Sequence, residues 1–335
     1  MLRFFVPNKD RLQVIVHTPD TPLAACADAV WCDLNAPTPE EDAFAEAWLG
    51  VPIPTREEMK DIEPSARLYV EDGAEVLIIT AIANIHTDEP IKTPLTFILK
   101  GRMLVTVRYS PFKGFSDFEA RVTRASDRPA LAGEAVMLGL LEAMVDRIAY
   151  LLELSGDDVD HVSHEVFRTS GIGAAPGRKR NKDRNLQALI EKIGRRGEVI
   201  SLARECLVST LRLASFHQTV TAGRPKSERD AVQELKTLQR DCLALTDHVN
   251  FLSGKLNFLL DATLGLINLE QNQIIKIFSI AAVVLLPPTV IGTIYGMNFN
   301  HMPEIGWTYG YPMALGLMVV SAALPYLFFK RQGWL

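Results

Sequence analysis

The sequence lacks the short motifs by which the commonest enzyme classes are recognised. It contains no G-x-S-x-G nucleophile turn, no H-E-x-x-H zinc helix and no G-x-x-x-x-G-K-[ST] phosphate loop. The glycine-rich stretch at 171–180 resembles a phosphate loop only superficially, because no strand is expected before it. We therefore expect no catalytic residues, no ATP-driven step and no cofactor.

Cysteine pairs and an N-terminal hydrophobic run are also missing. The four cysteines lie at 26, 32, 206 and 242 without a C-x-x-C pair, so we expect reduced, buried thiols rather than a zinc site or disulfides. No apolar run of signal-peptide length precedes the first charges of the chain. A net charge of −5 gives no electrostatic case for nucleic acid as a partner. The polar part of the chain is thus expected in the cytoplasm.

Charge is absent from two long stretches near the C-terminus, 277–295 and 312–329. Each is long enough to cross the hydrocarbon core of a bilayer, about 30 Å thick, as a helix. Lys276 precedes the first stretch and a basic tail follows the second, whereas Glu304 is the single charged residue between them. The positive-inside rule then places both termini in the cytoplasm of a multi-pass protein of the inner (plasma) membrane.

The rest of the pattern predicts an α+β protein whose polar mass precedes this hairpin. Proline, glycine and capping signals predict helices at 38–49 and 55–62 and strands at 29–34, 67–71, 75–85, 95–99 and 103–108. From 131 the apolar period becomes helical, with helices at 131–167 and 183–218 around a linker at 171–177. The expected parts are a mixed α/β sheet domain (1–130), a helical hairpin (131–225), a stalk helix (226–276), the first span (277–295), an external loop (296–311), the second span (312–329) and a basic tail (330–335).

The stalk is expected to continue into the first span as one helix, because no proline lies between Ser227 and Pro287. A helix from 227 to 295 would be on the order of 100 Å long. One face of it, at a period of 3.5 residues, carries small, hydroxyl, amide and acidic side chains with few large apolar ones. Its members are Asp261, Gly265, Asn268, Asn272, Ile275, Ser279, Ala282, Leu286, Thr289 and Thr293.

Two interpretations of this face, called here the polar stripe, are open. Small residues at such spacing let helices pack closely in lipid. Alternatively, several copies of the helix surround an axis and the stripe lines a pore. The amide and acidic positions favour the pore, because a coiled-coil seam outside the membrane would be apolar. One helix pair cannot enclose a pore, so this interpretation requires a cyclic homo-oligomer.

Gly296, Met297 and Asn298 follow directly at the outer end of the first span. Glycine commonly ends helices by taking positive φ, so the tripeptide alone is weak. Its position is informative, because Asn298 from each copy would form a ring of amide oxygens at a pore mouth. Such neutral oxygens suit a hydrated Mg²⁺ ion, which gives up its water reluctantly. We expect these three residues to form the selectivity filter.

At this point the sequence resembles the CorA family of divalent-cation channels, named for magnesium and cobalt transport. The resemblance rests on YGMNF at 295–299, MPE at 302–304, GYP at 310–312, KRQGWL at 330–335 and NQIIK at 272–276. It implies a funnel-shaped homopentamer that passes hydrated Mg²⁺, with Co²⁺ and Ni²⁺ as further candidate cargoes, down the membrane potential and is closed by cytoplasmic Mg²⁺ bound between subunits.

By the same resemblance, Asn298 is the selectivity residue and Glu304 lies in the external loop. Ile275, Phe278 and Leu286 fall at the hydrophobic constriction, and Asn272 and Asp261 at polar pore positions. Other members of the family often have methionine at the positions of Ile275 and Leu286, and they usually have leucine at the position of Phe278. A zinc-transporting branch shares the architecture, although its loop usually departs from the sequence seen here. A membrane-anchored sensor or scaffold is the alternative from another class.

Acidic residues outside the stripe are candidates for sensing the cation. One group combines acids with histidines three residues apart and fits either a divalent-ion site or, more commonly, a solvated helix face. Its members are Asp157, Asp158, Asp160, His161, His164 and Glu165. The stalk offers a second set, which consists of Asp230, Glu234, Asp241 and Asp247.

Overall fold

The structure is a computed structural model of the chain. It describes residues 1–9, 11–18, 21–61, 63, 67–85, 90–124, 132–169, 182–222, 229–298, 302–303 and 306–334, without the side chains of 23, 168–169, 182–185 and 229–230. The expected linker at 171–177, the capping residue Ser227, Glu304 and the side chain of Asp230 lie outside this description. The chain forms two compact units, residues 1–169 with 187–259 (the sheet unit) and residues 170–186 with 260–335 (the hairpin unit).

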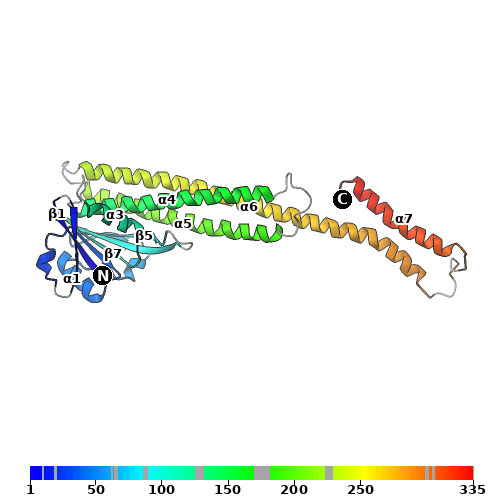
Figure 1. Cartoon of the computed structure of the whole chain (residues 1–335), viewed down its shortest axis with the longest axis horizontal. Helices are drawn as coiled ribbons and strands as arrows, with labels where there is room; N and C mark the ends of the chain where they lie inside the picture. Colours follow the sequence, from blue (N-terminus) through cyan, green and yellow to red (C-terminus); the bar gives the residue numbers. More distant parts are fainter. Residues whose placement is uncertain are drawn as a thin grey trace. The chain divides into compact units, whose positions relative to one another are not determined.

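The sheet unit is built on a seven-stranded mixed sheet in the order β2-β1-β3-β7-β6-β5-β4 (Figure 1). All neighbours pair antiparallel except β3 and β7, which are parallel. The strands are β1 (Leu2–Asn8), β2 (Arg11–Val16), β3 (Trp31–Asn35), β4 (Leu68–Glu71), β5 (Ala74–Ala83), β6 (Ile91–Lys100) and β7 (Met103–Arg108). Every residue of β5 is buried, as expected for a strand covered on both faces.

Helices cover the two faces of the sheet. On one face, α1 (Pro39–Leu49) packs Trp48 and Leu49 into a cluster with alternate residues of β5 such as Val76. On the other, His217 of α5 (Lys182–Thr221) meets Glu75 of β5, α4 (Gly133–Thr169) packs against β6 and β7, and α3 (Lys113–Val122) packs against α4. The sheet unit is therefore a three-layer α/β/α arrangement.

Several expected signals are realised in atomic detail. Thr38 caps α1 through the full reciprocal capping box with Glu41, and Gly50 ends the helix at φ 70°. Asp72 and Gly73 take φ 48° and 77° between β4 and β5, as a two-residue hairpin turn requires. The four cysteines are free and buried. The capping box, the helix end and the turn were readable from sequence because each depends on residues only a few positions apart.

Other expectations need correction. The helix expected at 55–62 is a single 3₁₀ turn, η2 (Glu58–Lys60), because Asp61 already takes extended backbone angles, although Thr55 and Glu58 do exchange capping hydrogen bonds. The strand expected to begin after Pro94 begins at Ile91. Strands β1 and β2 and helix α3 were not expected at all. A further short 3₁₀ helix, η1 (Leu23–Cys26), precedes β3.

Two buried ionic groups hold the sheet to its helices. Asp33, which is fully buried, accepts hydrogen bonds from Arg108 at 2.9 Å and from Arg3 at 2.8 Å, and Arg3 also pairs with Glu119 of α3 at 2.8 Å. Burial by itself raises the pKa of Asp33, but the two guanidinium groups outweigh it and hold that pKa below its usual value. Asp33 is thus a charged carboxylate that ties β3 to β1 and β7.

The second group is centred on His217 of α5, of which 1% is exposed. Its Nδ1 lies 2.6 Å from Glu75 of β5 and its Nε2 lies 3.0 Å from Glu134 of α4. Burial lowers the pKa of His217, but hydrogen bonds and charge interactions with both glutamates outweigh this and raise it to about 9. The imidazolium therefore bridges a strand and two helices.

This geometry predicts that the sheet unit loses stability as pH rises. The pKa of His217 is about 9 in the folded protein against 6.5 for the free side chain. The protonated His217 therefore contributes about 3 kcal/mol to the free energy of unfolding. This contribution is complete below pH ~6.5 and is lost progressively towards pH ~9. The thermal midpoint of the full-length protein in detergent, measured from pH 6 to 9.5, should fall across this window. His217→Gln should lower the midpoint at pH 6 and flatten the profile.

His248→Gln is the matched control, since His248 is exposed on helix α6 (Arg229–Tyr295). It should leave the pH profile unchanged. A His217→Gln profile that falls as steeply as that of the wild type would contradict a charged histidine at this position.

Candidate ion pathway

Helix α6 (Arg229–Tyr295) is one continuous helix of 67 residues and contains the whole of the first expected span. It continues through Pro287 and Pro288, which cannot donate hydrogen bonds to the preceding turn. Directly after the prolines, Thr289 Oγ1 donates to the carbonyl of Leu285 at 2.8 Å, and one turn later Thr293 Oγ1 donates to that of Thr289 at 2.7 Å. These threonines supply hydrogen bonds to backbone carbonyls in a helix that has lost two N–H donors.

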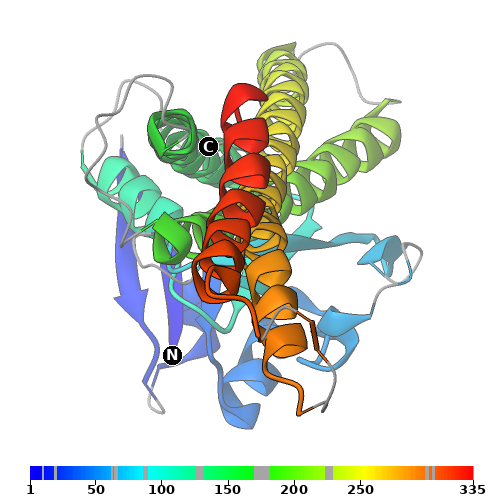
Figure 2. The same ribbon diagram turned by 90° about the vertical axis from the view of Figure 1, so that its right-hand side faces the viewer.

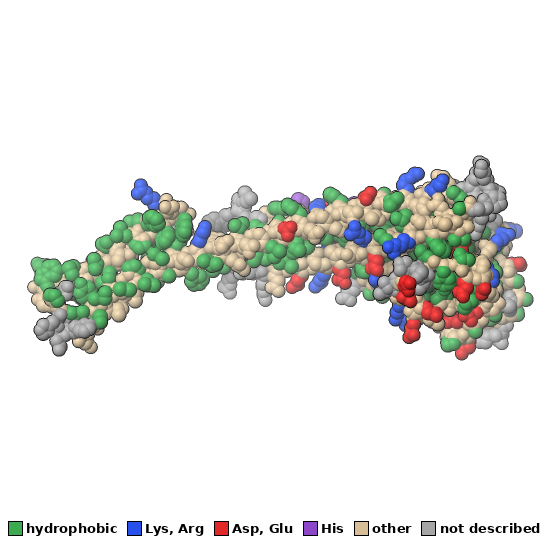
Figure 3. All heavy atoms as spheres, turned by 180° about the vertical axis from the view of Figure 1, so that it is seen from behind, with side chains coloured by type: hydrophobic (Ala, Val, Ile, Leu, Met, Phe, Trp, Pro, Cys, Tyr) green, Lys and Arg blue, Asp and Glu red, His purple; other side chains and the backbone are tan. Residues whose placement is uncertain are grey.

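Helix α7 (Gly310–Arg331) is the second span and extends two residues beyond the expected range at each end. Both α6 and α7 are long and apolar enough to cross a membrane. Figures 1 and 2 show α7 lying antiparallel along the last part of α6. In Figure 3, hydrophobic side chains cover this hairpin, whereas acidic side chains gather over the sheet unit.

The two helices meet along narrow seams. On α7 the least exposed residues recur every three or four positions and are mostly small, namely Gly310, Ala314, Met318, Ser321, Ala322, Pro325 and Phe329. On α6 the corresponding residues are Ile280, Val284, Pro287, Pro288, Ile291 and Tyr295. A Cβ atom built at Gly292 would lie 3.4 Å from Met318 Cε, so the helices approach closely there. The sequence analysis did not identify this seam, although its small-residue spacing is a recognised signal for packing in lipid.

The polar stripe lies on the side of α6 away from α7. At about 100° per residue, the stripe positions from Ile275 to Thr293 centre roughly opposite the α7-facing seam. All of them are exposed in the chain, and the large apolar members Ile275 and Leu286 have 61% and 62% of their surface accessible. Phe278, which is next to the stripe residue Ser279 in sequence, is 72% accessible. Asp261, Asn268 and Asn272 continue this exposed face towards the sheet-unit end of α6. Packing of α7 therefore does not explain the stripe.

The expected filter lies where α6 ends. Gly296 N donates to the Gly292 carbonyl at 3.0 Å and Met297 N to the Ile294 carbonyl at 3.2 Å, which closes the last turn. Gly296 does not have positive φ, so a left-handed helix end does not account for the glycine. The Asn298 side chain is exposed and makes no hydrogen bond with any residue that the structure describes. Its amide is thus available at the end of the stripe.

At the opposite end of the hairpin, a cation–π contact joins α6 to the residues that follow α7. Lys276 Nζ lies 5.6 Å from the centre of the Trp334 ring, and Trp334 stacks on Phe329 at 5.5 Å between centroids. Lys276, Lys330 and Arg331 therefore lie at the same end of the hairpin. This grouping is the one that the positive-inside rule requires for a cytoplasmic face.

The acidic cluster on α4 has partners within the chain. Asp158 pairs with Arg196 of α5 at 2.7 Å, Glu165 pairs with Lys192 at 3.0 Å, and Asp160 pairs with Lys255 of α6. The hydrogen bond from Lys255 lowers the pKa of Asp160 below its usual value. Nowhere in the described part of the chain do three or more acidic, histidine or cysteine side chains converge as metal ligands would.

The remaining candidates do not converge within one chain either. Asp157 is exposed on α4, and Glu234, Asp241 and Asp247 are exposed along α6. Their proposed role requires carboxylates of two subunits to meet, so it stays a prediction.

Comparison with known proteins agrees with this architecture. The family profile described as "CorA-like Mg2+ transporter protein" matches residues 27–331. The chain belongs to the CorA family. It is 32% identical over 321 residues to the magnesium transport protein CorA of Pasteurella multocida, covering 96% of each chain. The family assignment confirms the resemblance drawn from the loop and tail motifs.

Solved structures share the fold of this chain. The complete structure of the CorA magnesium transporter of Methanocaldococcus jannaschii aligns with a TM-score of 0.76 at 18% identity, covering 100% of this chain and 99% of that one. The cytoplasmic domain of ZntB from Vibrio parahaemolyticus aligns with a TM-score of 0.54 at 8% identity over 78% of this chain and 95% of that one. The expected fold, with a mixed sheet domain, a long helix and two C-terminal spans, is confirmed. The protein is a two-span membrane protein with both termini in the cytoplasm.

Cysteine accessibility distinguishes a water-filled stripe from a packed one. Thr289→Cys and Thr293→Cys on the stripe should react with a small, water-soluble, positively charged thiol reagent in proteoliposomes. Ile291→Cys, at the same depth but against α7, should react at least about tenfold more slowly, because thiolate formation requires water. The four native cysteines are buried and contribute little background. Equal labelling rates at 289 and 291 would show that the stripe is packed against lipid or protein.

Proposed function

We propose that this protein is a channel of the inner membrane that admits Mg²⁺ to the cytoplasm as a homopentamer, with α6 of each copy around a central axis. The observation that supports this most strongly is the position of the polar stripe opposite α7. In such an assembly α7 forms the outer, lipid-facing ring and the stripe faces the axis. The exposed apolar side chains of α7, such as Leu315, Val319 and Leu324, suit contact with lipid.

The hydroxyls of the stripe are oriented for a hydrated cation. Because Thr289 and Thr293 donate their hydroxyl protons to helix carbonyls, the lone pairs of each hydroxyl oxygen remain available to accept hydrogen bonds. Water molecules around Mg²⁺ point their hydrogens outward, so they donate to such acceptors. The Asn298 amide oxygens act in the same way at the outer end. Neutral acceptors hold the hydrated ion weakly enough to release it.

The membrane potential suffices to drive entry. Moving one charge through 100 mV yields about 2.3 kcal/mol, and a divalent ion gains about twice that. No nucleotide-driven step is needed. The exposed Ile275, Phe278 and Leu286 side chains, gathered around the axis, form an apolar constriction that closes by excluding water.

Cytoplasmic Mg²⁺ between neighbouring subunits is the proposed closing signal, and Co²⁺ and Ni²⁺ are further candidate cargoes. Among the acidic candidates, Asp158 and Asp160 would have to give up Arg196 and Lys255 to bind an ion. Asp157, Asp241 and Asp247 are exposed and form no ion pair with any residue that the structure describes. Their carboxylates would therefore not have to break an ion pair of this kind to bind an ion. Asp230 and Glu234 at the start of α6 remain in the candidate set.

Zn²⁺ transport is the second candidate, because the ZntB cytoplasmic domain shares the fold of the sheet unit with part of the helical region. A shared fold therefore does not distinguish a Mg²⁺ transporter from a Zn²⁺ transporter. Competition between Mg²⁺ and Zn²⁺ for flux in proteoliposomes, with and without a proton gradient, distinguishes them. A sensor or scaffold would need no polar face through the membrane, and absence of any divalent flux would favour it.

Asn298→Ala should reduce Mg²⁺ uptake into proteoliposomes more than about tenfold, since each subunit loses one hydrogen-bond acceptor for the water around the ion and the loss is multiplied around the ring. Size-exclusion chromatography should show unchanged assembly. Asn298→Asp should bind Mg²⁺ more tightly and saturate at a lower maximal flux. Gln273→Ala, which removes an amide from the opposite face of α6, is the matched control and should transport normally. Unchanged uptake by Asn298→Ala would remove the role assigned to this residue.

A further inference from the structure

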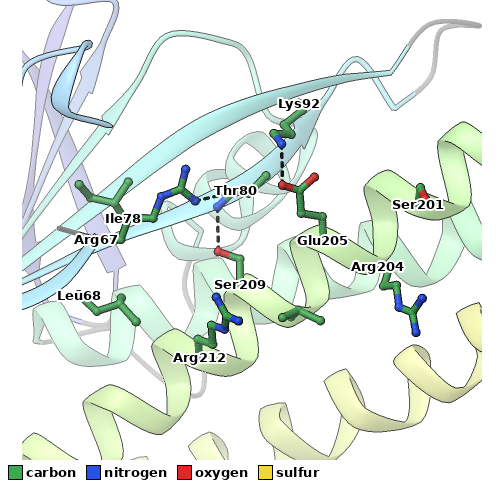
Figure 4. Close-up of a pocket in the computed structure, with 11 residues that line it drawn as sticks. Arg67, Leu68, Ile78, Thr80, Lys92, Ser201, Arg204, Glu205, Ser209 and Arg212 are labelled. Atoms are coloured by element: carbon green, nitrogen blue, oxygen red, sulfur yellow. Dashed lines mark hydrogen bonds and ion pairs between the residues drawn. The ribbon is translucent and has the colours of Figure 1, made fainter. Parts of the chain in front are cut away.

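The sheet unit contains a cavity of about 460 Å³ that the proposed ion pathway does not use (Figure 4). It lies between α5 and the edge of β5. The described residues of β4 pair with β5 as far as Leu77. Three residues further along β5, the Thr80 N–H donates to Ser209 Oγ of α5 at 3.0 Å. The cavity is thus fixed on one side by a strand and on the other by a helix.

Positive charge is concentrated around this cavity. Arg67, Lys92, Arg204 and Arg212 line it, and Glu205 is the one acid among the lining residues that the structure describes. The chain as a whole has a net charge of −5, so the local excess is opposite in sign to that of the protein. Cations lining a partly enclosed cavity attract anions more strongly than the same charges on an open surface do.

The contacts of these cations show which of them are available to a ligand. Lys92 Nζ pairs with Glu205 at 2.5 Å, and Arg67 Nη1 donates to Thr80 Oγ1 at 3.1 Å. Arg204 donates to Asn250 of α6 at 2.5 Å, and Figure 4 shows it turned towards α6. Arg212 rises from α5 beside Ser209 and makes no hydrogen bond or ion pair with any residue that the structure describes.

The remaining lining completes a site for an organic anion. Ser201 and Ser209 offer hydroxyl groups, and Leu68, Ile78 and Val208 form an apolar part of the wall. Arginine pairs with phosphate through two parallel hydrogen bonds, and the volume is within the range of small-molecule sites. We propose that this cavity binds a phosphate-bearing small molecule, with Arg212, Arg67 and Lys92 around the phosphate and the apolar wall against its organic part.

This site is independent of the proposed ion pathway, because all of its residues belong to the sheet unit. Failure of one proposal therefore leaves the other intact. The probes distinguish the sources of phosphate. Inorganic phosphate supplies the charge alone, AMP adds a base that can contact the apolar wall, and adenosine supplies the base alone.

Binding is measured by isothermal titration calorimetry on the full-length protein in detergent, with EDTA present to remove divalent cations. AMP should bind more tightly than inorganic phosphate, and adenosine should not bind detectably. Arg212→Gln should weaken AMP binding about tenfold, which corresponds to about 1.4 kcal/mol, the size expected for one charge-assisted hydrogen bond. Glu205→Gln should instead tighten binding, because it removes the competing carboxylate and releases Lys92.

Arg240→Gln, an equal change of charge at an exposed position of α6, is the control and should bind as the wild type does. Arg212→Gln should also retain wild-type Mg²⁺ flux. The proposal is overturned if the wild type binds none of the probes, or if Arg212→Gln and Arg240→Gln weaken binding equally. It is also overturned if Arg212→Gln dissociates the oligomer, since a neighbouring copy would then be the occupant of the cavity.

Discussion

A polar side chain on a membrane helix must face protein or water, because hydrocarbon offers it no partner. This constraint gives the two sides of α6 different roles. One side packs against the small residues of α7, and the other carries the exposed stripe of Ser279, Thr289 and Thr293. Because the partner helix of the same chain occupies the far side, we propose that further copies of the chain shelter the stripe. The proposed channel follows from this division of one helix surface.

The sheet unit uses charge differently. Asp33 and His217 are buried ionised groups, and each is fully paired with side chains from distant elements. Removing one partner from such a group leaves an unpaired buried charge, which typically costs 3–5 kcal/mol. The fold thereby holds β1, β3, β5, α3, α4 and α5 in one arrangement. The cavity beside Thr80 depends on that arrangement, since its two sides come from β5 and α5.

Sequence reasoning succeeded where the physical signal is local. The spans were found from their length and lack of charge, and α1 from the capping box of Thr38 and the glycine at 50. It failed for α3, which begins after Phe112 without a side-chain cap, and for β1, where the partly buried Arg3 interrupts the apolar pattern. Pro94 concealed the first residues of β6. In each failure, contacts with distant residues outweighed the local preference.

The sequence by itself determined the unbroken course of α6, the two spans, their orientation and the family, because lipid thickness, charge asymmetry and short motifs are properties of neighbouring residues. Only the tertiary structure decided that α7 lies opposite the stripe, that Asp158 and Asp160 pair with cations of other helices, and that Arg67, Lys92 and Arg212 surround one cavity. These outcomes depend on residues that are far apart along the chain. Helical periodicity shows which residues share a face, but folding determines what that face meets.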